Sequence, residues 1–298
     1  MWFRNLCIYE LAETWTLHTD HLNTRLRAFE FQPVGGTERS SRGWVSPLGR
    51  GDRPLVHVAN GRIMVCLQEE ARILPPAVVR DELEEPVADR EEIQERRLGK
   101  RERARMREEL YLELLPRAFT RTTRTHAYID PEERILVVDA ASWREGEGLT
   151  EDLRAALGTL PIRPLQTEAS PQQAMTAWIA RDQWPAGVEP GETAVFEDPR
   201  AAGSEVRVKR HDLRTAEIRG LIEPGHRVRR LALTWDQRID CVLDADLSVK
   251  QLRFLDVVQD DADDREPESA AERFDADFSI MTLELARFVE AMRGWFTP

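Results

Sequence analysis

Two groups of basic side chains provide the clearest chemistry in the sequence. The first group follows a charged segment that ends at Pro116, and the second follows the strand-like stretch Val206–Val208. Lys and Arg side chains that contact phosphates release counterions, which gives salt-dependent affinity without discrimination between bases. The candidate phosphate-binding residues are Arg117, Arg121, Arg124, Lys209, Arg210 and His211.

The distribution of charge favours this interpretation, although the chain has a net charge of −12. Residues 95–124 contain ten Arg or Lys and five Glu, and residues 203–230 contain eight Arg or Lys and four acids. By contrast, residues 256–277 contain ten acids. A basic surface on an acidic body could bind phosphates locally while the rest of the protein repels them.

An acidic cluster suggests a second chemistry, the metal-dependent cleavage of nucleic acid. Consecutive carboxylates could bind Mg²⁺, but this stretch lacks the glycine and the terminal glutamate of an EF-hand, and acids in a polar linker are usually solvated. A metal-dependent nuclease is therefore kept as an alternative, and we expect no metal or cofactor. The cluster consists of Asp260, Asp261, Asp263, Asp264 and Glu266.

Other reaction signatures give no catalytic centre. The phosphate-binding Gly-x-x-x-x-Gly-Lys-Ser/Thr and the hydrolase pattern Gly-x-Ser-x-Gly do not occur in the sequence. His18 and His21 flank Asp20, and we interpret all three as polar residues near the start of a helix. His57 lies in an apolar strand-like stretch, which is typical of a structural histidine.

Size and composition indicate a folded protein with a highly charged surface. The chain has 298 residues, of which 41% are hydrophobic and 32% charged, and we expect two or three lobes. No run of about 18 apolar residues predicts a transmembrane helix, and the first residues resemble a strand more than a signal peptide. Cys7, Cys66 and Cys241 are far apart, which fits a reducing cytoplasm.

Local patterns predict an α+β fold in which antiparallel hairpins and meanders alternate with helices. Asn60-Gly61 favours a tight type I′ turn between two short strands. We expect strands at 3–11, 55–59, 62–67, 126–129, 134–138, 231–235, 238–243 and 250–255. We expect helices at 20–29, 89–114, 150–157, 172–182 and 278–296. The rest of 161–199 and the acidic stretch 256–277 are predicted to be irregular.

These elements suggest four consecutive parts. We expect an N-terminal α+β lobe over 1–75 and a long, charged, projecting helical segment over 76–116. A central α+β lobe would cover 117–200, and a C-terminal meander with a closing helix would cover 201–298. A third interpretation follows from the projecting segment, because its charged helix could bind a protein partner in a scaffold that does not bind DNA.

Short motifs in order along nearly the whole chain resemble the RdgC family of recombination-associated proteins. Their order and spacing make the resemblance specific, and residues 89–107 are the least similar part. The motifs are Trp2-Phe3-Arg4-Asn5-Leu6, Gly43-Trp44-Val45-x-Pro47, His57-Val58-Ala59-Asn60-Gly61, Ile73-Leu74-Pro75, Leu114-Leu115-Pro116-Arg117-Ala118-Phe119, Leu157-Gly158-x-Leu160-Pro161, Trp235-x-Gln237-Arg238-Ile239 and Arg273-Phe274-Asp275-Ala276-Asp277-Phe278.

The resemblance implies a crescent-shaped protomer, two copies of which close into a homodimeric ring around double-stranded DNA. It also implies sequence-independent binding that limits RecA-promoted recombination, a cytoplasmic and nucleoid-associated location, and no enzymatic activity. Phe119 corresponds to a dimer-contact position, and Arg117 and Lys209 match DNA-binding positions of the family. Arg210 and His211 depart from the usual Lys-Gln of the family.

Overall fold

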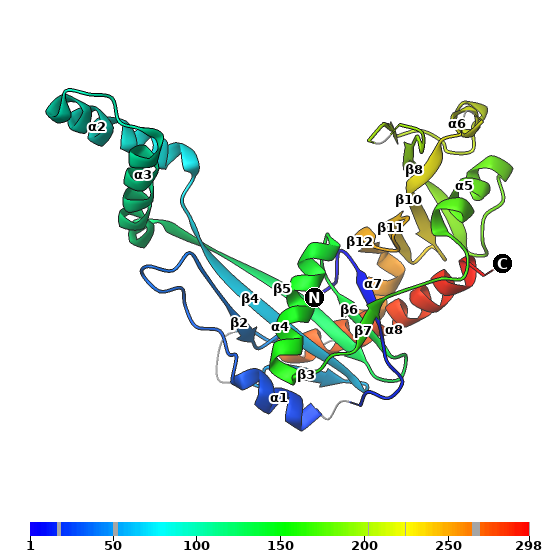
Figure 1. Ribbon diagram of the computed structural model, residues 1–298. Coiled ribbons are helices and arrows are strands. Elements are labelled where there is room, and N and C mark those ends of the chain that lie inside the picture. Colours follow the sequence, from blue (N-terminus) through cyan, green and yellow to red (C-terminus); the bar gives the residue numbers. More distant parts are fainter. Residues whose placement is uncertain (17–18, 50–52, 202, 224, 264–268, 298) are drawn as a thin grey trace.

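The computed structural model describes residues 1–16, 19–49, 53–201, 203–223, 225–263 and 269–297. Two antiparallel sheets and their helices form a crescent, with helices α2 (Pro76–Gln94) and α3 (Lys100–Leu114) at one tip and α6 (Ala216–Ile222) at the other (Figure 1). The predicted α+β class is confirmed.

The first sheet has seven strands in the order β2-β4-β5-β6-β1-β7, with β3 also paired to β4. The predicted hairpin is confirmed, because Asn60 and Gly61 adopt the positive φ angles of +48° and +77° that a type I′ turn requires. The strands are β1 Cys7–Leu11, β2 Ser40–Val45, β3 Val56–Ala59, β4 Arg62–Ile73, β5 Phe119–Asp130, β6 Ile135–Val138 and β7 Ile162–Pro164.

Strands β4 and β5 extend well beyond the predicted hairpins. They pair continuously from Ile63 opposite Ile129 to Ile73 opposite Phe119. The prediction was too short because the outer half, over 68–72 and 119–125, is polar and rich in threonine, so it shows no hydrophobic alternation. Threonine nevertheless favours the extended backbone, and the paired strands form an arm that carries α2 and α3 (Figure 1).

The second sheet has five strands in the order β12-β11-β10-β8-β9. Its β10–β11–β12 meander was predicted correctly, but the prediction that 161–199 is mostly irregular was wrong. Pro190-Gly191 interrupts the strand pattern of β8, and a Cβ on Gly191 would lie 2.9 Å from the Cβ of Ala232. The strands are β8 Val188–Glu197, β9 Glu205–Lys209, β10 Arg227–Trp235, β11 Ile239–Asp244 and β12 Val249–Phe254.

Helices surround the two sheets. The predicted helix 150–157 begins earlier, at Trp143, where Ser142 accepts a hydrogen bond from the amide of Glu145. The helices are α1 Thr19–Arg27, α2 Pro76–Gln94, α3 Lys100–Leu114, the short 3₁₀ turn η1 Leu115–Arg117, α4 Trp143–Leu157, α5 Pro171–Arg181, α6 Ala216–Ile222, α7 Asp256–Asp263 and α8 Ala270–Trp295.

The single helix predicted over 89–114 was wrong, because the chain breaks between α2 and α3. Glu95 adopts a φ of +49° after α2, and Gly99 is the N-cap of α3. Glu102 accepts hydrogen bonds from the Gly99 amide and from Arg96, and the Arg96 bond contributes most to lowering the pKa of Glu102 to about 2. Leu98 is buried in this connection, which offsets the loss of helical continuity.

The acidic stretch 256–277 is not a linker, because it contains α7 and the first two turns of α8. Ser269 caps α8 by accepting a hydrogen bond from the amide of Glu272. Asp275 and Asp277 lie inside α8. Asp275 lies 3.3 Å from Nε2 of His57, and Asp277 pairs with the amino group of Met1.

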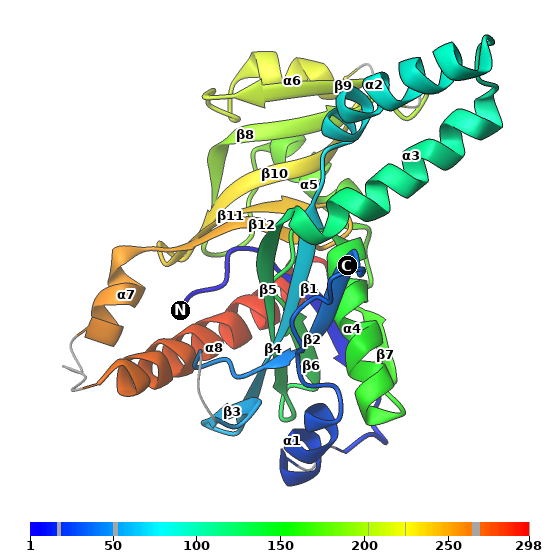
Figure 2. The same cartoon turned by 90° about the vertical axis from the view of Figure 1, so that its left-hand side faces the viewer.

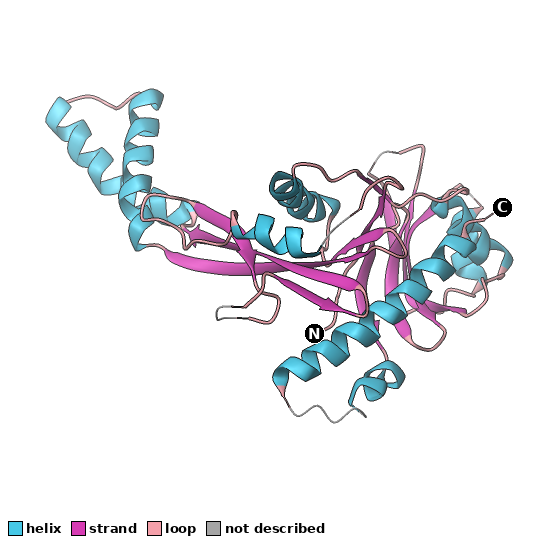
Figure 3. Cartoon of the chain, turned by 90° about the horizontal axis from the view of Figure 1, so that it is seen from below, coloured by secondary structure: helices cyan, strands magenta, loops and turns pink. Residues whose placement is uncertain are grey.

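Two hydrophobic cores share the first sheet between them. Met64 and Tyr128 face a core that also includes the second sheet, α5 and α8. Val65 and Ala127, one residue along each strand, face the core under α1 and α4. The long helix α8 crosses both sheets (Figure 3). The two arms of the crescent are therefore joined through a common core.

The partial burial of His126 on β5 makes stability depend on pH. Desolvation lowers the pKa of His126 from 6.5 to about 4, so the unfolded chain binds more protons than the folded chain between those values. We expect the free energy of unfolding to fall by about 2 kcal/mol between pH 6.5 and 5 through this group. In urea titrations at both pH values, His126→Gln should lose this difference, and equal losses in both proteins would contradict the assignment.

Candidate nucleic-acid interface

The concave side of the crescent brings the two predicted basic regions onto facing arms (Figure 1). Arg117, Arg121 and Arg124 belong to η1 and β5, whereas Lys209 is the last residue of β9. The view along the crescent shows the five-stranded sheet face-on beyond α2 and α3, with α5 behind it (Figure 2). One face of this sheet is therefore turned toward the other arm.

The strand alternation of β9 decides which side chains lie on that open face. Val206 and Val208 pack against the core. Glu205, Arg207 and Lys209 consequently point to the opposite face. On β12, Lys250 and Arg253 likewise alternate with core residues, since Val249, Leu252 and Phe254 are buried.

Lys209, Arg210 and His211 form a turn at the end of β9. Arg210 adopts a φ of +53°, and Lys209 and Arg210 are exposed, with no ion pair to any residue that the structure describes. His211 is more restrained, since its Nε2 lies 3.4 Å from the carboxylate of Glu217 and its Nδ1 lies 3.1 Å from the carbonyl of Asp212. Lys209 and Arg210 are thus the side chains here that are most available to an external anion.

The junction between α3 and β5 is held by Arg72. Its guanidinium group donates to the carbonyl oxygens of Leu115, Pro116 and Ala118 at 3.1, 3.1 and 3.3 Å. These bonds satisfy carbonyls that the end of a helix leaves unpaired. They fix the backbone on both sides of Arg117, whose side chain is exposed.

The side chains of β5 do not form one basic cluster. Phe119 and Arg121 lie on one face of the strand, and Arg124 lies on the other because it is an odd number of residues away. Arg124 donates from Nε to the side-chain oxygen of Gln68 at 2.9 Å, whereas no described residue forms an ion pair with Arg121. Arg121 is therefore the freer of the two cations.

Phe119 and the outer edge of β5 form an unusual exposed surface. The side chain of Phe119 is 87% exposed, although it is large and apolar. Residues 119–125 pair with β4 on one side, while β6 begins to pair only at Ala127. Within the described residues, this leaves the second edge of the outer strand open. Open edges and exposed aromatic side chains are typical of surfaces that pair with another chain.

Comparison with known proteins places the chain in a family. A family model described as "RdgC: Putative exonuclease, RdgC" matches residues 1–297. The chain belongs to the RdgC family. The curated "Recombination-associated protein RdgC" of Halorhodospira halophila is 48% identical over 296 residues, which cover 99% of this chain and 98% of that relative. The RdgC protein of Yersinia pestis (strain Pestoides F) is 38% identical over 298 residues, with the same coverage. The resemblance inferred from the short motifs is confirmed.

The acidic cluster proposed for a nuclease within this RdgC chain lies outside the residues whose side chains the structure describes. Those residues are Asp260, Asp261, Asp263, Asp264 and Glu266. Across the described residues, no three His, Cys, Asp or Glu side chains are grouped to hold a metal ion. His18 is also outside the described residues, and His57 packs against Phe274 and Phe278 beside Asp275.

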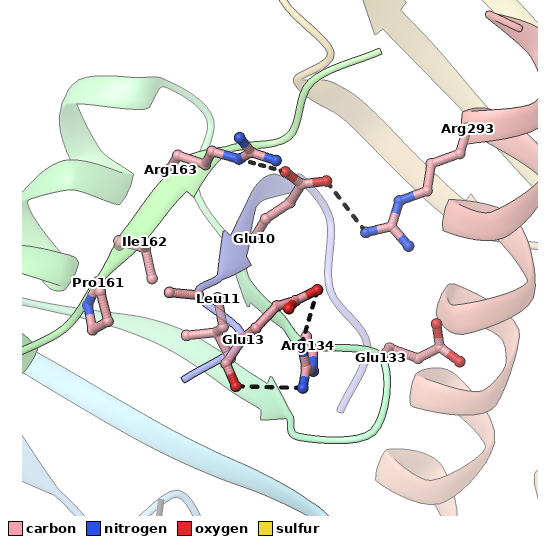
Figure 4. Close-up of a pocket in the computed structure, with 10 residues that line it drawn as sticks. Glu10, Leu11, Glu13, Glu133, Arg134, Pro161, Ile162, Arg163 and Arg293 are labelled. Carbon is pink, nitrogen blue, oxygen red and sulfur yellow. Dashed lines mark hydrogen bonds and ion pairs between the residues drawn. The ribbon is translucent and has the colours of Figure 1, made fainter. Parts of the chain in front are cut away.

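A pocket of about 520 Å³ at the β1–β7 edge of the RdgC fold is dominated by ion pairs (Figure 4). Glu10 lies between Arg163 and Arg293, at 2.8 and 3.6 Å, and Arg134 pairs with Glu13 at 3.6 Å. The lining contains no His, Cys or Ser. Arg134, Arg163 and Arg293 are all paired with carboxylates, so no cation of this lining is left unpaired to bind an anion.

A groove of about 640 Å³ separates α2 from α3. Its lining includes the apolar or aromatic side chains of Val79, Leu83 and Tyr111 and the cations Lys100 and Arg107. Part of the groove lies in 89–107, the stretch least similar to the family motifs, and the helical prediction over 89–114 gave no sign of the groove. The groove requires the chain break at Glu95, because a single continuous helix would not place α3 beside α2.

Sequence reasoning missed the basic side chains on the open face of the five-stranded sheet. Arg230 lies on β10 and Lys250 and Arg253 lie on β12, so they are separated in sequence and were not recognised as members of one sheet face. The available signal was the alternation of charged residues with buried Val249, Leu252 and Phe254. No described helix in this RdgC chain is both long enough and apolar enough to cross a membrane.

Proposed function

We propose that this chain binds double-stranded DNA without reading its sequence, as a homodimeric ring. The observation that supports the proposal most directly is the arrangement of Arg117, Arg121, Lys209 and Arg210 as exposed cations on two facing arms. The first two lie on the arm with α3, and the other two lie on the sheet with α6. Two crescents whose tips meet would surround a duplex with cations from both arms.

Sequence independence follows from the kind of contact available. The candidate cations project from a sheet face, a turn and the end of a strand, and such side chains suit contacts to phosphate oxygens. Phosphate contacts set the position and affinity of a protein on DNA but carry no sequence information. Enclosure within a ring would slow dissociation without tight contacts to bases.

A protein that occupies the duplex would oppose the pairing of that duplex with a recombination filament. The RdgC relatives are named recombination-associated proteins, which supports a role in this process. We therefore propose that the chain limits RecA-dependent recombination and associates with the nucleoid in the cytoplasm. No catalytic step is part of this function.

The experiment that tests this function is a gel shift with duplexes of random sequence at several salt concentrations. We expect similar affinities for unrelated sequences and a linear decrease of log K with log salt. An absence of binding at low salt would leave the scaffold interpretation, which the groove between α2 and α3 favours.

The same preparation separates DNA binding from cleavage. The family description includes the word exonuclease, so a metal-dependent nuclease remains the alternative enzyme. Incubation with linear and circular plasmid in Mg²⁺ or Mn²⁺ would reveal cleavage. Loss of cleavage in a variant with Asp260, Asp261 and Asp263 changed to Asn would assign it to the acidic cluster.

Phe119 is proposed as a dimer contact, and its replacement should weaken the ring. An aromatic side chain that is 87% exposed in one protomer would become buried against a second copy. We expect Phe119→Ser to raise the dimer dissociation constant by about 30-fold for each copy of Phe119 that the dimer buries, from a loss of about 2 kcal/mol of apolar burial per copy. Light scattering over a dilution series measures this, with Leu283→Ser, which removes an exposed apolar side chain of α8 away from the tips, as the control. An unchanged mass at every concentration would contradict the assignment.

A further inference from the structure

We infer that three carboxylates on the open face of the five-stranded sheet, Glu205, Asp240 and Asp244, act as internal competitors of DNA phosphates. They hold the cations of this face in the free protein, and they lower the affinity for duplex DNA. The inference rests on the proposed function, because it concerns how tightly the same concave surface binds a polyanion.

Asp240 and Arg253 form the first such pair, on neighbouring strands β11 and β12. Arg253 donates to Oδ2 of Asp240, and the hydroxyl of Thr234 on β10 donates to Oδ1 at 2.6 Å. The guanidinium side chain is 69% exposed, while Asp240 is 28% exposed. The carboxylate is therefore fixed in the sheet, and the cation can move from it to an external anion.

Asp244 holds two cations from opposite sides. Arg230 on β10 donates from Nε to Oδ2 at 2.6 Å, and the ammonium group of Lys250 on β12 lies 3.5 Å from the same oxygen. Asp244 is only 4% exposed. Because this carboxylate is buried between two cations, it is a structural part of the face and a poor choice for mutation.

Glu205 on the edge strand β9 holds the third group. Its two oxygens lie 2.8 Å from Arg207 and 2.8 Å from Arg229. Hydrogen bonding to Arg207 is the main cause of the lowered pKa of Glu205. Lys209, two residues further along the same face of β9, has no such partner among the described residues.

The three groups together carry five cations and three carboxylates, so the face is only weakly positive. The more exposed pairs, those of Asp240 and Glu205, contribute about 0–1 kcal/mol each, so a phosphate could replace either carboxylate at small cost. The displaced carboxylate would stay close to the phosphate and repel it. The array thus favours contacts that form and break readily, which suits a ring that moves along its duplex.

Neutral isosteres of two carboxylates test this inference. Asp240→Asn and Glu205→Gln keep the size of each side chain but remove its charge. We expect each variant to bind random-sequence duplex about 8-fold more tightly at about 0.1 M salt, with a log–log salt slope steeper by about 0.9, as for one added phosphate contact. Fluorescence anisotropy with a labelled duplex measures both quantities, and thermal unfolding checks that the variants fold.

Glu10→Gln is the matched control for Glu205→Gln. Glu10 is 21% exposed and pairs with two arginines, as Glu205 does at 20% exposure, but it lies in the pocket of Figure 4 at the β1–β7 edge. This control should leave affinity nearly unchanged. Unchanged or weaker binding by the two test variants, or an equal gain in the control, would overturn the inference. If the wild-type protein does not bind duplex at all, the proposed function itself fails.

Discussion

Simultaneous Lys209→Ala and Arg210→Ala substitutions are expected to weaken duplex binding to the same degree on unrelated sequences. Both side chains are exposed at the end of β9, and neither forms an ion pair with a described residue. Each lost phosphate contact removes about 0.9 from the log–log salt slope, or about 8-fold in affinity at about 0.1 M salt. The double variant should therefore bind about 60-fold more weakly, and more so if both protomers contribute.

The control for this result removes two cations elsewhere. Arg134→Ala with Arg163→Ala changes the net charge equally, but both residues line the pocket at the β1–β7 edge. If simple charge attraction decided affinity, this control would weaken binding as much as the loss of Lys209 and Arg210. A loss confined to one DNA sequence would contradict phosphate contact, and an unchanged salt slope would remove these residues from the interface.

Short-range patterns predicted those elements whose signal lies within a few residues. The turn at Asn60-Gly61 needs positive φ angles that these residue types accept, so the hairpin could be located without the rest of the chain. The meander over β10–β12 alternates apolar and polar residues and was found for the same reason. Its detailed register was not predictable, because an irregularity shifts the β11–β12 pairing between Asp240 and Val242.

The elements that were missed depend on specific contacts that hydrophobic periodicity does not reveal. The threonine-rich outer half of β5 becomes a strand because it pairs with β4, about 50 residues earlier. The break before α3 depends on Glu91, whose side chain accepts hydrogen bonds from the amide of Leu98 and from Arg103. The break between α2 and α3 was not evident from helical periodicity, because the charged residues around it would fit a continuous helix equally well.

For the candidate interface too, the residue types could be predicted from the sequence, but their arrangement in space could not. The basic character of Arg117 and Lys209 was visible in the sequence, and the resemblance to RdgC singled them out. Their placement on facing arms is a consequence of tertiary structure. The sequence also grouped Arg121 with Arg124, although the pleat of β5 sends these side chains to opposite faces. The carboxylates that neutralise the open sheet face could be recognised only from the register of neighbouring strands.

The relative position of the two arms depends on how the second sheet is fixed to α8. Arg238, which follows the tight β10–β11 turn, donates from Nε and Nη2 to the two carboxylate oxygens of Glu284 on α8 at 2.8 and 2.9 Å. Glu284 is 4% exposed, and Arg287 lies 3.3 Å from one of its oxygens. This bidentate pair explains why the motif Trp235-x-Gln237-Arg238-Ile239 includes an arginine at that place.

Glu284→Ala is expected to lower the free energy of unfolding by about 3 kcal/mol. Removal of one partner of a buried ion pair typically costs about 3–5 kcal/mol because the other charge is left uncompensated, and Arg238 is 21% exposed, which favours the lower value. Urea unfolding measures the change, with Glu109→Ala as the control. Glu109 pairs with Arg105 on the surface of α3, where the expected loss is under about 0.5 kcal/mol. Equal losses in the two variants would show that Glu284 does not anchor the sheet, and the orientation of the concave face would then have to depend on apolar packing alone.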